Sequence, residues 1–522
     1  MEISEKIGTY LTGRDLQKSI PPDEPRITVN EAVGAVAFYY EKLRNVVDYQ
    51  DEHLIRQNAI RRIIKRRLIV QDSYEDVALS LLKELVRSRY FPNGTISYGK
   101  VQEVSHILAL YIGVVDALAS DTNFSDRDKD TLIAYAACAI DENLASMAQE
   151  EALVKLMYDT CEAELVPTDL DTDEKIRKTQ IFVACYRVLL RPDAERLRYF
   201  LLKQMYSVCT RAAEADPKDF AKNFFSVQKK IQDIIRHPHN KKLLPFLRRY
   251  RIPFILLHTI VRSKSKSILE DPDELEKQIQ KLCEQLYASQ RKRLYGRSIR
   301  AFVYIFLTKM LLGIGVELPY DLFTIRHINS LPLIVNIAFP PILLLCMTLS
   351  AKLPGAENTT RILQAVKEIV YADEPRIVFT AQRLPTKKKR IVLPIIFTFL
   401  YLVLFAVSFG AIAWALRSLQ FNIVSGVIFF LFLSLVTFFG VSIRRSVQEY
   451  VMIVKKPNVL MAFLDPFFLP IIQMGRWLSF NISRINVFVF IFDVLIELPF
   501  QALIDITEEW FIFIREKKEE ME

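Results

Sequence analysis

The sequence predicts an all-α protein in which a soluble helical N-terminal domain is followed by a helical transmembrane region. Apolar residues recur at helical spacing through the first part of the chain, between helix-capping residues. The long apolar runs are concentrated after about residue 300, although charged residues make up 25% of the 522-residue chain. This uneven distribution separates a water-exposed region from a membrane region.

Helix start signals organise the first region. Ser125 precedes DRDKDTLIAYAACAI, and Pro192 precedes DAERLRYFLLKQMY, so each helix begins with acidic residues that suit the helix dipole. We expect a cytosolic α-helical domain over residues 1–270, formed by one or two subdomains, and a charged helical connector over 271–300. The opening text MEISEKIGTYLTGRDLQ is polar and does not have the pattern of a signal peptide, which favours a cytosolic N-terminus.

Four apolar stretches predict the spans of a transmembrane region over 301–441. A hydrocarbon core of about 30 Å requires about 20 helical residues, a length that these stretches approach or exceed. The first stretch contains Lys309, and the second contains Asn336 and the pair Pro340 and Pro341. The predicted spans lie near residues 301–318, 331–351, 391–416 and 422–441.

The basic residues predict the topology. The loop 352–390 ends in four bases, and the segment after residue 441 is also basic, so both belong on the cytoplasmic side. This gives a multi-pass protein of the cytoplasmic (inner) membrane with both termini in the cytoplasm. We expect contacts with anionic lipid headgroups at the basic end of the connector and at the basic end of this loop. The residues are Arg291, Lys292, Arg293, Arg297, Arg300, Lys387, Lys388, Lys389 and Arg390.

The C-terminal region, residues 442–522, combines apolar text with charge. Asp493 and Glu497 lie inside the run before Pro499, and two central acids cost about 5 to 7 kcal/mol of insertion free energy, as much as the apolar neighbours contribute. We therefore expect a cytoplasmic loop, interfacial or re-entrant amphipathic helices and a charged tail. Upstream, Asp465, Pro466 and Pro470 are expected to break the helix.

Two sets of charged residues are candidate functional sites. Lys309, Asn336, Asp493 and Glu497 form a candidate intramembrane polar site. The alternative is that Lys309 extends its ammonium to the interface and the acids face water. The second set is a candidate basic interaction face for anionic lipid or, less favoured, nucleic acid, opposite a stripe of Ile60, Ile63, Ile64 and Leu68. Its members are Arg56, Arg61, Arg62, Lys65, Arg66 and Arg67; a solvated surface is the alternative.

The sequence contains few signs of catalysis. The motifs GxxxxGK[ST], GxGxxG, GxSxG and HExxH do not occur. The aspartates of VPTDLDTDEK lack the glycine and glutamate of a calcium loop. The six cysteines form no CxxC pair, so we expect reduced, buried thiols, no metal site and no cofactor.

Four strings, ELPYDLF, VNIAFPPILLL, GRWLSF and NVFVFIFDVLIELPF, together resemble an uncharacterised family of bacterial multi-pass membrane proteins with a long helical cytoplasmic region. The resemblance covers the chain from about Ser298 onward. It implies the membrane architecture and no assigned activity, cofactor or catalytic residue.

The expected function is that of a membrane-anchored cytosolic scaffold or adaptor without catalytic activity, which organises partners at the inner face of the membrane. Its partners would be anionic lipids and an unidentified protein, and a homo-oligomer is compatible with the sequence. The alternative is a transporter or channel that uses Lys309 with Asp493 and Glu497. A membrane enzyme with a dispersed active site is the third hypothesis.

Overall fold

The computed structural model describes residues 4–12, 24–30, 52–70, 73–162, 174–206, 216–263, 267–325, 330–349, 354–372, 392–448, 450–452 and 459–484. Nearly all of these residues are helical, which confirms the predicted all-α fold, and one isolated bridge pairs Arg26 with Ser97. The chain divides into two compact units. Unit 1 comprises residues 1–7, 163–172 and 245–486, and unit 2 comprises 8–162, 173–244 and 487–522. The expected domain boundary at residue 270 therefore lies inside unit 1.

Unit 2 is a helical domain with its own core. Its helices are α3 (Glu52–Val70), α4 (Tyr74–Arg87), α5 (Gly99–Leu118), α6 (Asp126–Leu144), α7 (Ala148–Cys161), α8 (Glu174–Leu190), α9 (Ala194–Met205) and α10 (Pro217–Arg236). The predicted start of α6 is confirmed, because Ser125 and Asp128 form a reciprocal capping box. Asp193 caps α9 through the backbone N–H of Arg196. Two short helices lie at the unit boundaries, α1 (Glu5–Thr12) and α11 (Pro238–Arg249).

The centre of unit 2 is α5, which packs against α4, α6 and α10. By length and composition alone this helix could cross a membrane. However, its apolar residues, such as Leu108 and Tyr111, are buried by the neighbouring helices, while Gln102, Glu103 and Asp116 are exposed. An apolar face covered by protein and a polar face in water are typical of a core helix. We therefore assign α5 to the core of unit 2.

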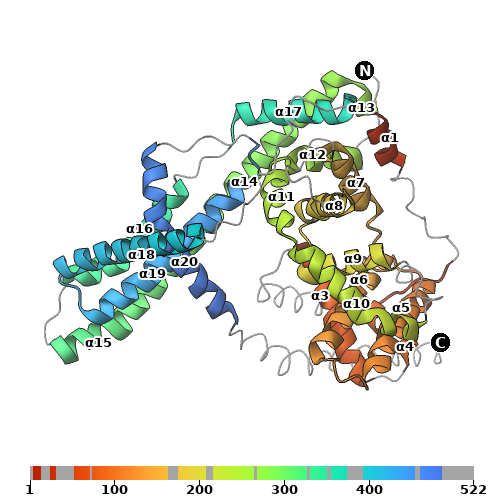
Figure 1. Cartoon of the computed structure of the whole chain (residues 1–522), viewed down its shortest axis with the longest axis horizontal. Coiled ribbons are helices and arrows are strands. Elements are labelled where there is room, and N and C mark those ends of the chain that lie inside the picture. Colours follow the sequence, from red (N-terminus) through yellow and green to blue (C-terminus); the bar gives the residue numbers. More distant parts are fainter. Residues whose placement is uncertain are drawn as a thin grey trace, which may run out of the picture. The chain divides into compact units, whose positions relative to one another are not determined.

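Unit 1 contains the membrane-spanning bundle (Figure 1). Its helices are α12 (Arg251–Ser263), α13 (Ser267–Glu270), α14 (Pro272–Leu312), α15 (Leu318–Tyr320), α16 (Ser330–Leu349), α17 (Ala356–Tyr371), α18 (Val392–Ser418), α19 (Ile423–Gln448) and α20 (Val459–Arg484). Two π-helical turns, η4 (Gly313–Glu317) and η5 (Asp321–Ile325), flank α15. Four helical stretches of this unit are long and apolar enough to cross a membrane, namely 272–323, 331–349, 395–418 and 423–443. Each overlaps one of the four predicted spans, and together they indicate a multi-pass membrane protein.

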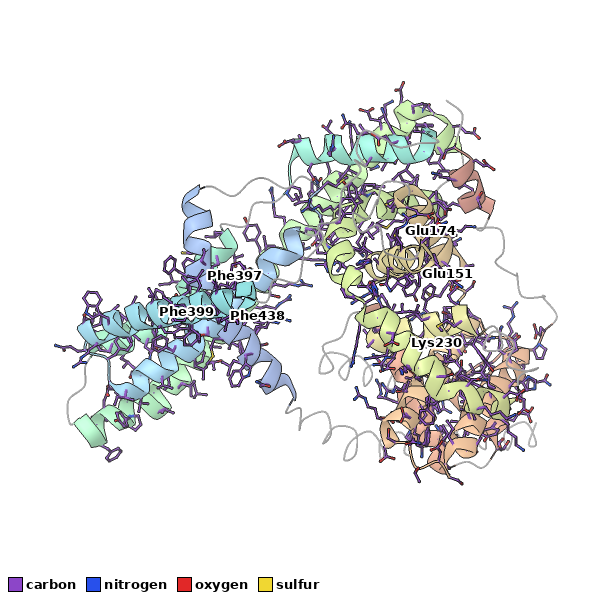
Figure 2. The ribbon with its side chains drawn as sticks, viewed as in Figure 1. Glu151, Glu174, Lys230, Phe397, Phe399 and Phe438 are labelled. Atoms are coloured by element: carbon purple, nitrogen blue, oxygen red, sulfur yellow. The ribbon has the colours of Figure 1, made fainter. Side chains whose placement is uncertain are left out.

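The outer surface of the bundle is apolar. Phe397 and Phe399 on α18 are 59% and 67% exposed, and Figure 2 shows both on the ribbon of the bundle. Such a continuous apolar surface is unfavourable in water, whereas hydrocarbon solvates it. By contrast, Glu174 and Lys230, which are labelled on unit 2 in the same figure, are exposed charged residues.

Hydrogen bonds identify the two ends of the bundle. At one end, Asn358 of α17 donates to Tyr287 Oη of α14 at 2.9 Å and to the carbonyl of Tyr450, beyond α19, at 3.0 Å. Ser4 N–H donates to the carbonyl of Val370 at 2.9 Å, so this part of the N-terminus lies at the same end. At the other end, Asn422, before α19, donates to Asp321 at 2.6 Å. We name these the α17 end and the α15 end; the segments predicted to be cytoplasmic meet at the α17 end.

The helix α20 is continuous, so the break expected at Asp465, Pro466 and Pro470 does not occur. It packs against α18 and α19, where Ser408 Oγ donates to the carbonyl of Phe467 and Tyr401 donates to Gln473. Prolines are tolerated inside membrane helices because neighbouring helices and hydroxyl side chains support the backbone. The remainder of the predicted interfacial region, from residue 485 onward, lies outside the described residues.

Candidate functional site

The candidate site is a buried polar network inside the bundle. Lys309, near the middle of the first span, is 0% exposed, and Glu317, eight residues later, is 1% exposed. Residues eight apart in a straight α-helix lie about 80° from each other around the helix axis. The intervening π-helical turn η4 closes i→i+5 hydrogen bonds and holds more residues per turn, which reduces this angle. The two charged side chains therefore face the same side.

Asn336 of α16 connects the two charges. Lys309 Nζ donates to Asn336 Oδ1 at 2.5 Å, and Asn336 Nδ2 lies 2.7 Å from both carboxylate oxygens of Glu317. The direct distance from Lys309 Nζ to Glu317 Oε1 is 3.9 Å. The amide accepts from the cation and donates to the anion, so one neutral side chain satisfies both charges. This arrangement offsets part of the cost of burying an ion pair.

The network continues toward the α15 end. Asn336 Nδ2 also lies 3.2 Å from the carbonyl oxygen of Ser425, and Ser425 N–H donates to Asn422 Oδ1 at 2.6 Å. The amide of Asn422 in turn donates to Asp321 Oδ1. The polar network thus comprises Lys309, Glu317, Asp321, Asn336, Asn422 and Ser425, and extends from the middle of the bundle to the half-buried Asn422.

Apolar side chains close the network toward the α17 end. Ile305, Leu344, Phe432 and Val436 form a buried cluster, and the ring centroid of Phe432 lies 4.6 Å from Lys309 Nζ. An ammonium group over an aromatic face gains cation–π stabilisation. The site is therefore asymmetric, because its polar groups lead toward one end of the bundle and its apolar cluster seals the other.

The sequence identified only part of this site. The structure brings Lys309 and Asn336 together, whereas Asp493 and Glu497 lie outside the described residues. Glu317 and Asp321 were not among the candidates, although Glu317 is the second-last residue of the predicted first span, 301–318; Asp321 follows that span. The signal that could have indicated them is the i, i+4 spacing of two acids directly after an apolar run that already contains a lysine.

The predicted lipid contacts on α14 are exposed side chains. Arg291, Lys292, Arg293, Arg297 and Arg300 are all exposed, while Leu294 and Ser298 face the protein. Within the described ranges, none of these five bases forms an ion pair or a side-chain hydrogen bond. Lys387, Lys388, Lys389 and Arg390 lie outside the described residues.

The candidate basic face on α3 does not form an open surface. Ile60, Ile63 and Ile64 are buried as expected, whereas Leu68 and the bases are half-buried. At least five of the six bases pair with acids of neighbouring helices. Arg56 pairs with Asp141, Arg61 and Lys65 with Asp130, and Arg66 and Arg67 with Glu84. The packing of α3 against α4 and α6 supplies these acids, so most of the positive charge is compensated within unit 2.

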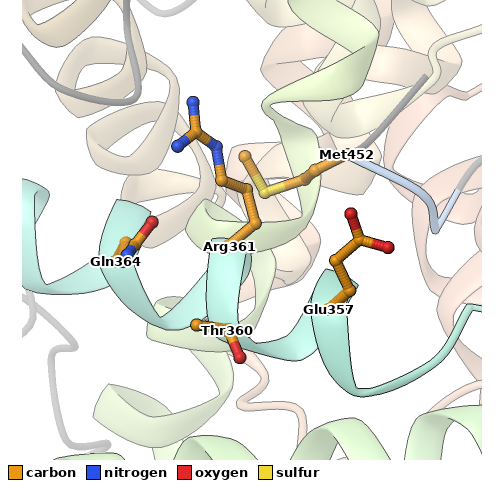
Figure 3. A pocket seen from close by; sticks show the side chains of 5 residues that line it. All are labelled: Glu357, Thr360, Arg361, Gln364 and Met452. Carbon is orange, nitrogen blue, oxygen red and sulfur yellow. The ribbon is translucent and has the colours of Figure 1, made fainter. Parts of the chain in front are cut away.

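A hollow of about 580 Å³ lies over α17 and is open to solvent (Figure 3). It is lined by Glu357, Thr360, Arg361, Gln364 and Met452. Elsewhere, the described residues contain no group of three or more His, Cys, Asp or Glu side chains able to hold a metal ion. The polar network is therefore the candidate site with the most specific geometry.

Comparisons with protein-family models, with curated proteins and with solved structures returned no match to this chain.

Proposed function

We propose that this chain is a non-catalytic scaffold or adaptor anchored in the cytoplasmic membrane, with the α17 end of the bundle in the cytoplasm. The observation that carries this proposal is the continuity of α14. Its 41 residues extend for about 62 Å without interruption. Its first half packs against α13 and α17, and its second half packs against α16 and α19. A rigid helix of this kind fixes a water-exposed helical assembly to the membrane.

The bases of α14 support this orientation. The exposed bases from Arg291 to Arg300 immediately precede the apolar part of α14, where they would reach anionic headgroups of the inner leaflet. Each base near such a surface contributes about 1 kcal/mol of binding free energy. Anionic lipids are thus the first proposed partner. An unidentified protein that binds unit 2 is the second, and self-association of the chain is compatible with both.

Site-specific photo-crosslinking in cells tests the scaffold proposal. A photo-reactive amino acid at the exposed position Lys230 or Glu174 of unit 2 should capture the same protein, while one at Phe397 on the bundle surface should not. The captured protein should leave the membrane fraction in cells that lack this chain. If its membrane fraction is unchanged in those cells, or if nothing is captured from unit 2, the scaffold proposal is wrong.

The polar network favours a second candidate, ion-coupled transport. Ionisable residues inside membrane spans are costly and often mark ion or proton paths. The purified chain in sealed liposomes would then dissipate an imposed pH gradient, and Lys309→Met would abolish this flux. If protein-free liposomes lose the pH gradient at the same rate, the chain alone does not transport protons.

A further inference from the structure

Gly296 is a glycine in the interior of α14 that packs against no other part of the described chain. A glycine at such a position destabilises a helix relative to alanine. Some helical glycines are needed for close packing, because a Cβ there would collide with a neighbouring helix. A Cβ added at Gly296 would meet nothing within 4 Å, and its backbone does not have a positive φ. The missing side chain therefore leaves a strip of bare backbone that a ligand can approach closely.

Bases surround this strip. Residues three and four positions apart are neighbours on a helix surface, and for Gly296 these neighbours are Lys292, Arg293, Ile299 and Arg300. The next residue, Arg297, is itself a neighbour of two of these bases. All four bases are exposed, and the chain contains no acid between Glu284 and Glu317. We call Gly296 together with these bases the Gly296 site; its members are Gly296, Lys292, Arg293, Arg297 and Arg300.

The Gly296 site faces away from the bundle. At about 100° per residue, the buried Leu294 and Ser298 lie about 160° from Gly296, one on each side of the helix axis. Val303 and Leu307, which are exposed, lie within about 20° of Gly296. The face that carries the bases therefore continues into the span as an exposed apolar stripe.

This order of groups matches a phospholipid, which joins phosphate to acyl chains. A nucleic-acid backbone also suits a row of bases, but it has no apolar part for Val303 and Leu307. The number of bases indicates more than one phosphate. A phosphodiester carries a single negative charge, and one guanidinium can bond two of its oxygens. Three arginines and a lysine are therefore better matched by two phosphates than by one.

We propose that the Gly296 site binds one phospholipid that carries two phosphates. The phosphates lie against the bare backbone of Gly296 and the bases around it, and the acyl chains lie along Val303 and Leu307. Arg291 is about 140° from Gly296 around the helix and provides only general attraction to an anionic membrane. The inference names the lipid partner of the scaffold proposal, and it rests on the membrane orientation proposed there.

Native mass spectrometry of the full-length chain in detergent micelles tests the choice of lipid. Cardiolipin carries two phosphates and phosphatidylglycerol carries one, so the two lipids are compared at equal phosphate concentration. The wild type should retain one cardiolipin at a phosphate concentration about tenfold lower than it requires for phosphatidylglycerol, because one headgroup bonds several bases. Equal binding of the two lipids would overturn the proposal.

Gly296→Leu tests the bare backbone without changing any charge. Leucine favours the helix, but its side chain occupies the place of the phosphate, so cardiolipin binding should weaken about tenfold, to the level of phosphatidylglycerol. Gly410→Leu is the matched control. Gly410 is an exposed glycine of α18 whose Cβ would also meet nothing within 4 Å, so this variant should bind cardiolipin as the wild type does. Circular dichroism verifies that each variant is folded.

A pair of arginine variants provides a second test that does not depend on Gly296→Leu. Arg300→Gln and Arg291→Gln remove the same charge from exposed positions of α14. Arg300→Gln should weaken cardiolipin binding about tenfold through the loss of a charge-assisted contact. Arg291→Gln should weaken it about twofold or less, as expected for a screened surface charge.

Unchanged cardiolipin binding in folded Gly296→Leu would overturn the proposal, because the phosphate would not lie against the backbone. Equal losses in the two arginine variants would also overturn it, since they would show attraction without a defined site. The protein captured by unit 2 depends on neither measurement. Failure of the lipid site is therefore distinguishable from failure of the scaffold proposal.

Discussion

Lys309 and Glu317 lie 3.9 Å apart on one helical segment, and the Asn336 side chain of another helix bonds to both. This relationship places a cation, an amide and an anion in a bundle whose other described contacts are mostly apolar. Because the amide satisfies both charged groups, it holds α14, η4 and α16 in one register. The Asn336 amide also lies within hydrogen-bond distance of the backbone carbonyl of Ser425, which connects α19 to the same network.

Asn336→Leu should lower the free energy of unfolding of the bundle by about 3 to 5 kcal/mol, because two buried charges lose their hydrogen bonds. Reversible unfolding in lipid bicelles measures this change. Ser434→Ala is the matched control, because its buried hydroxyl on α19 has no described partner and its loss should cost less than about 1 kcal/mol. Equal stability of Asn336→Leu and the wild type would show that the amide does not hold the helices together.

The sequence predicted the four spans because a long uncharged run is a local property. Lys309 and Asn336 could be selected because each is a polar residue inside such a run. Glu317, at the end of the predicted first span, and Asp321, three residues after that span, were not selected. They join the helix only through the π-helical turns η4 and η5, and their burial depends on α16 and on Asn422. A one-dimensional pattern does not show whether the chain turns outward or continues as a π-helix.

The surfaces of α3 and α20 illustrate the same limit. The isoleucine stripe of α3 predicted correctly which side is buried, but not that Glu84, Asp130 and Asp141 would meet its flanking bases. The prolines of α20 predicted a break, because local rules consider only the bonds that proline removes. The packing of α18 and α19 against α20 supports its backbone at the prolines, and this tertiary packing is not visible in the local sequence.

Gly475→Ala should disrupt the packing of α20 on α19. A Cβ at this position would overlap the carbonyl oxygen of Ser434, which is backbone and cannot rotate away. We expect a loss of at least about 1 to 3 kcal/mol in the free energy of unfolding. Gly426→Ala is the control, because its Cβ would meet nothing within 4 Å and alanine favours a helix. If both variants unfold at the same denaturant concentration, this close approach is absent in the bilayer.

In unit 2, Arg196→Met should destabilise the domain far more than Arg198→Met on the same helix. Arg196 is buried, and its Nη1 lies 3.0 Å from the buried Asp141 carboxylate, which would lose this partner. We expect a cost of about 3 to 5 kcal/mol. Arg198 pairs with Glu195 in a partly exposed i,i+3 pair, whose loss should cost under about 1 kcal/mol. Thermal unfolding of the full chain, followed by hydrogen exchange in α6 and α9, measures both. Similar protection in the two variants would contradict the buried pair.

The cysteines of unit 2 should resist alkylation while the domain is folded. Burial raises the pKa of the Cys138 and Cys185 thiols well above the ordinary value, so both remain protonated at pH 8. The thiolate is the reactive form, and an ordinary thiol near pKa 8.5 becomes about tenfold more reactive per pH unit below that value. Raising the pH from 7 to 8 should therefore increase labelling of an added Ser226→Cys, at an exposed position, but not of Cys138 or Cys185. Mass spectrometry of maleimide adducts reads each site separately, and all three should react after unfolding. Labelling of Cys138 in the folded chain at the rate of the Ser226→Cys thiol would show that α6 opens on the timescale of the reaction.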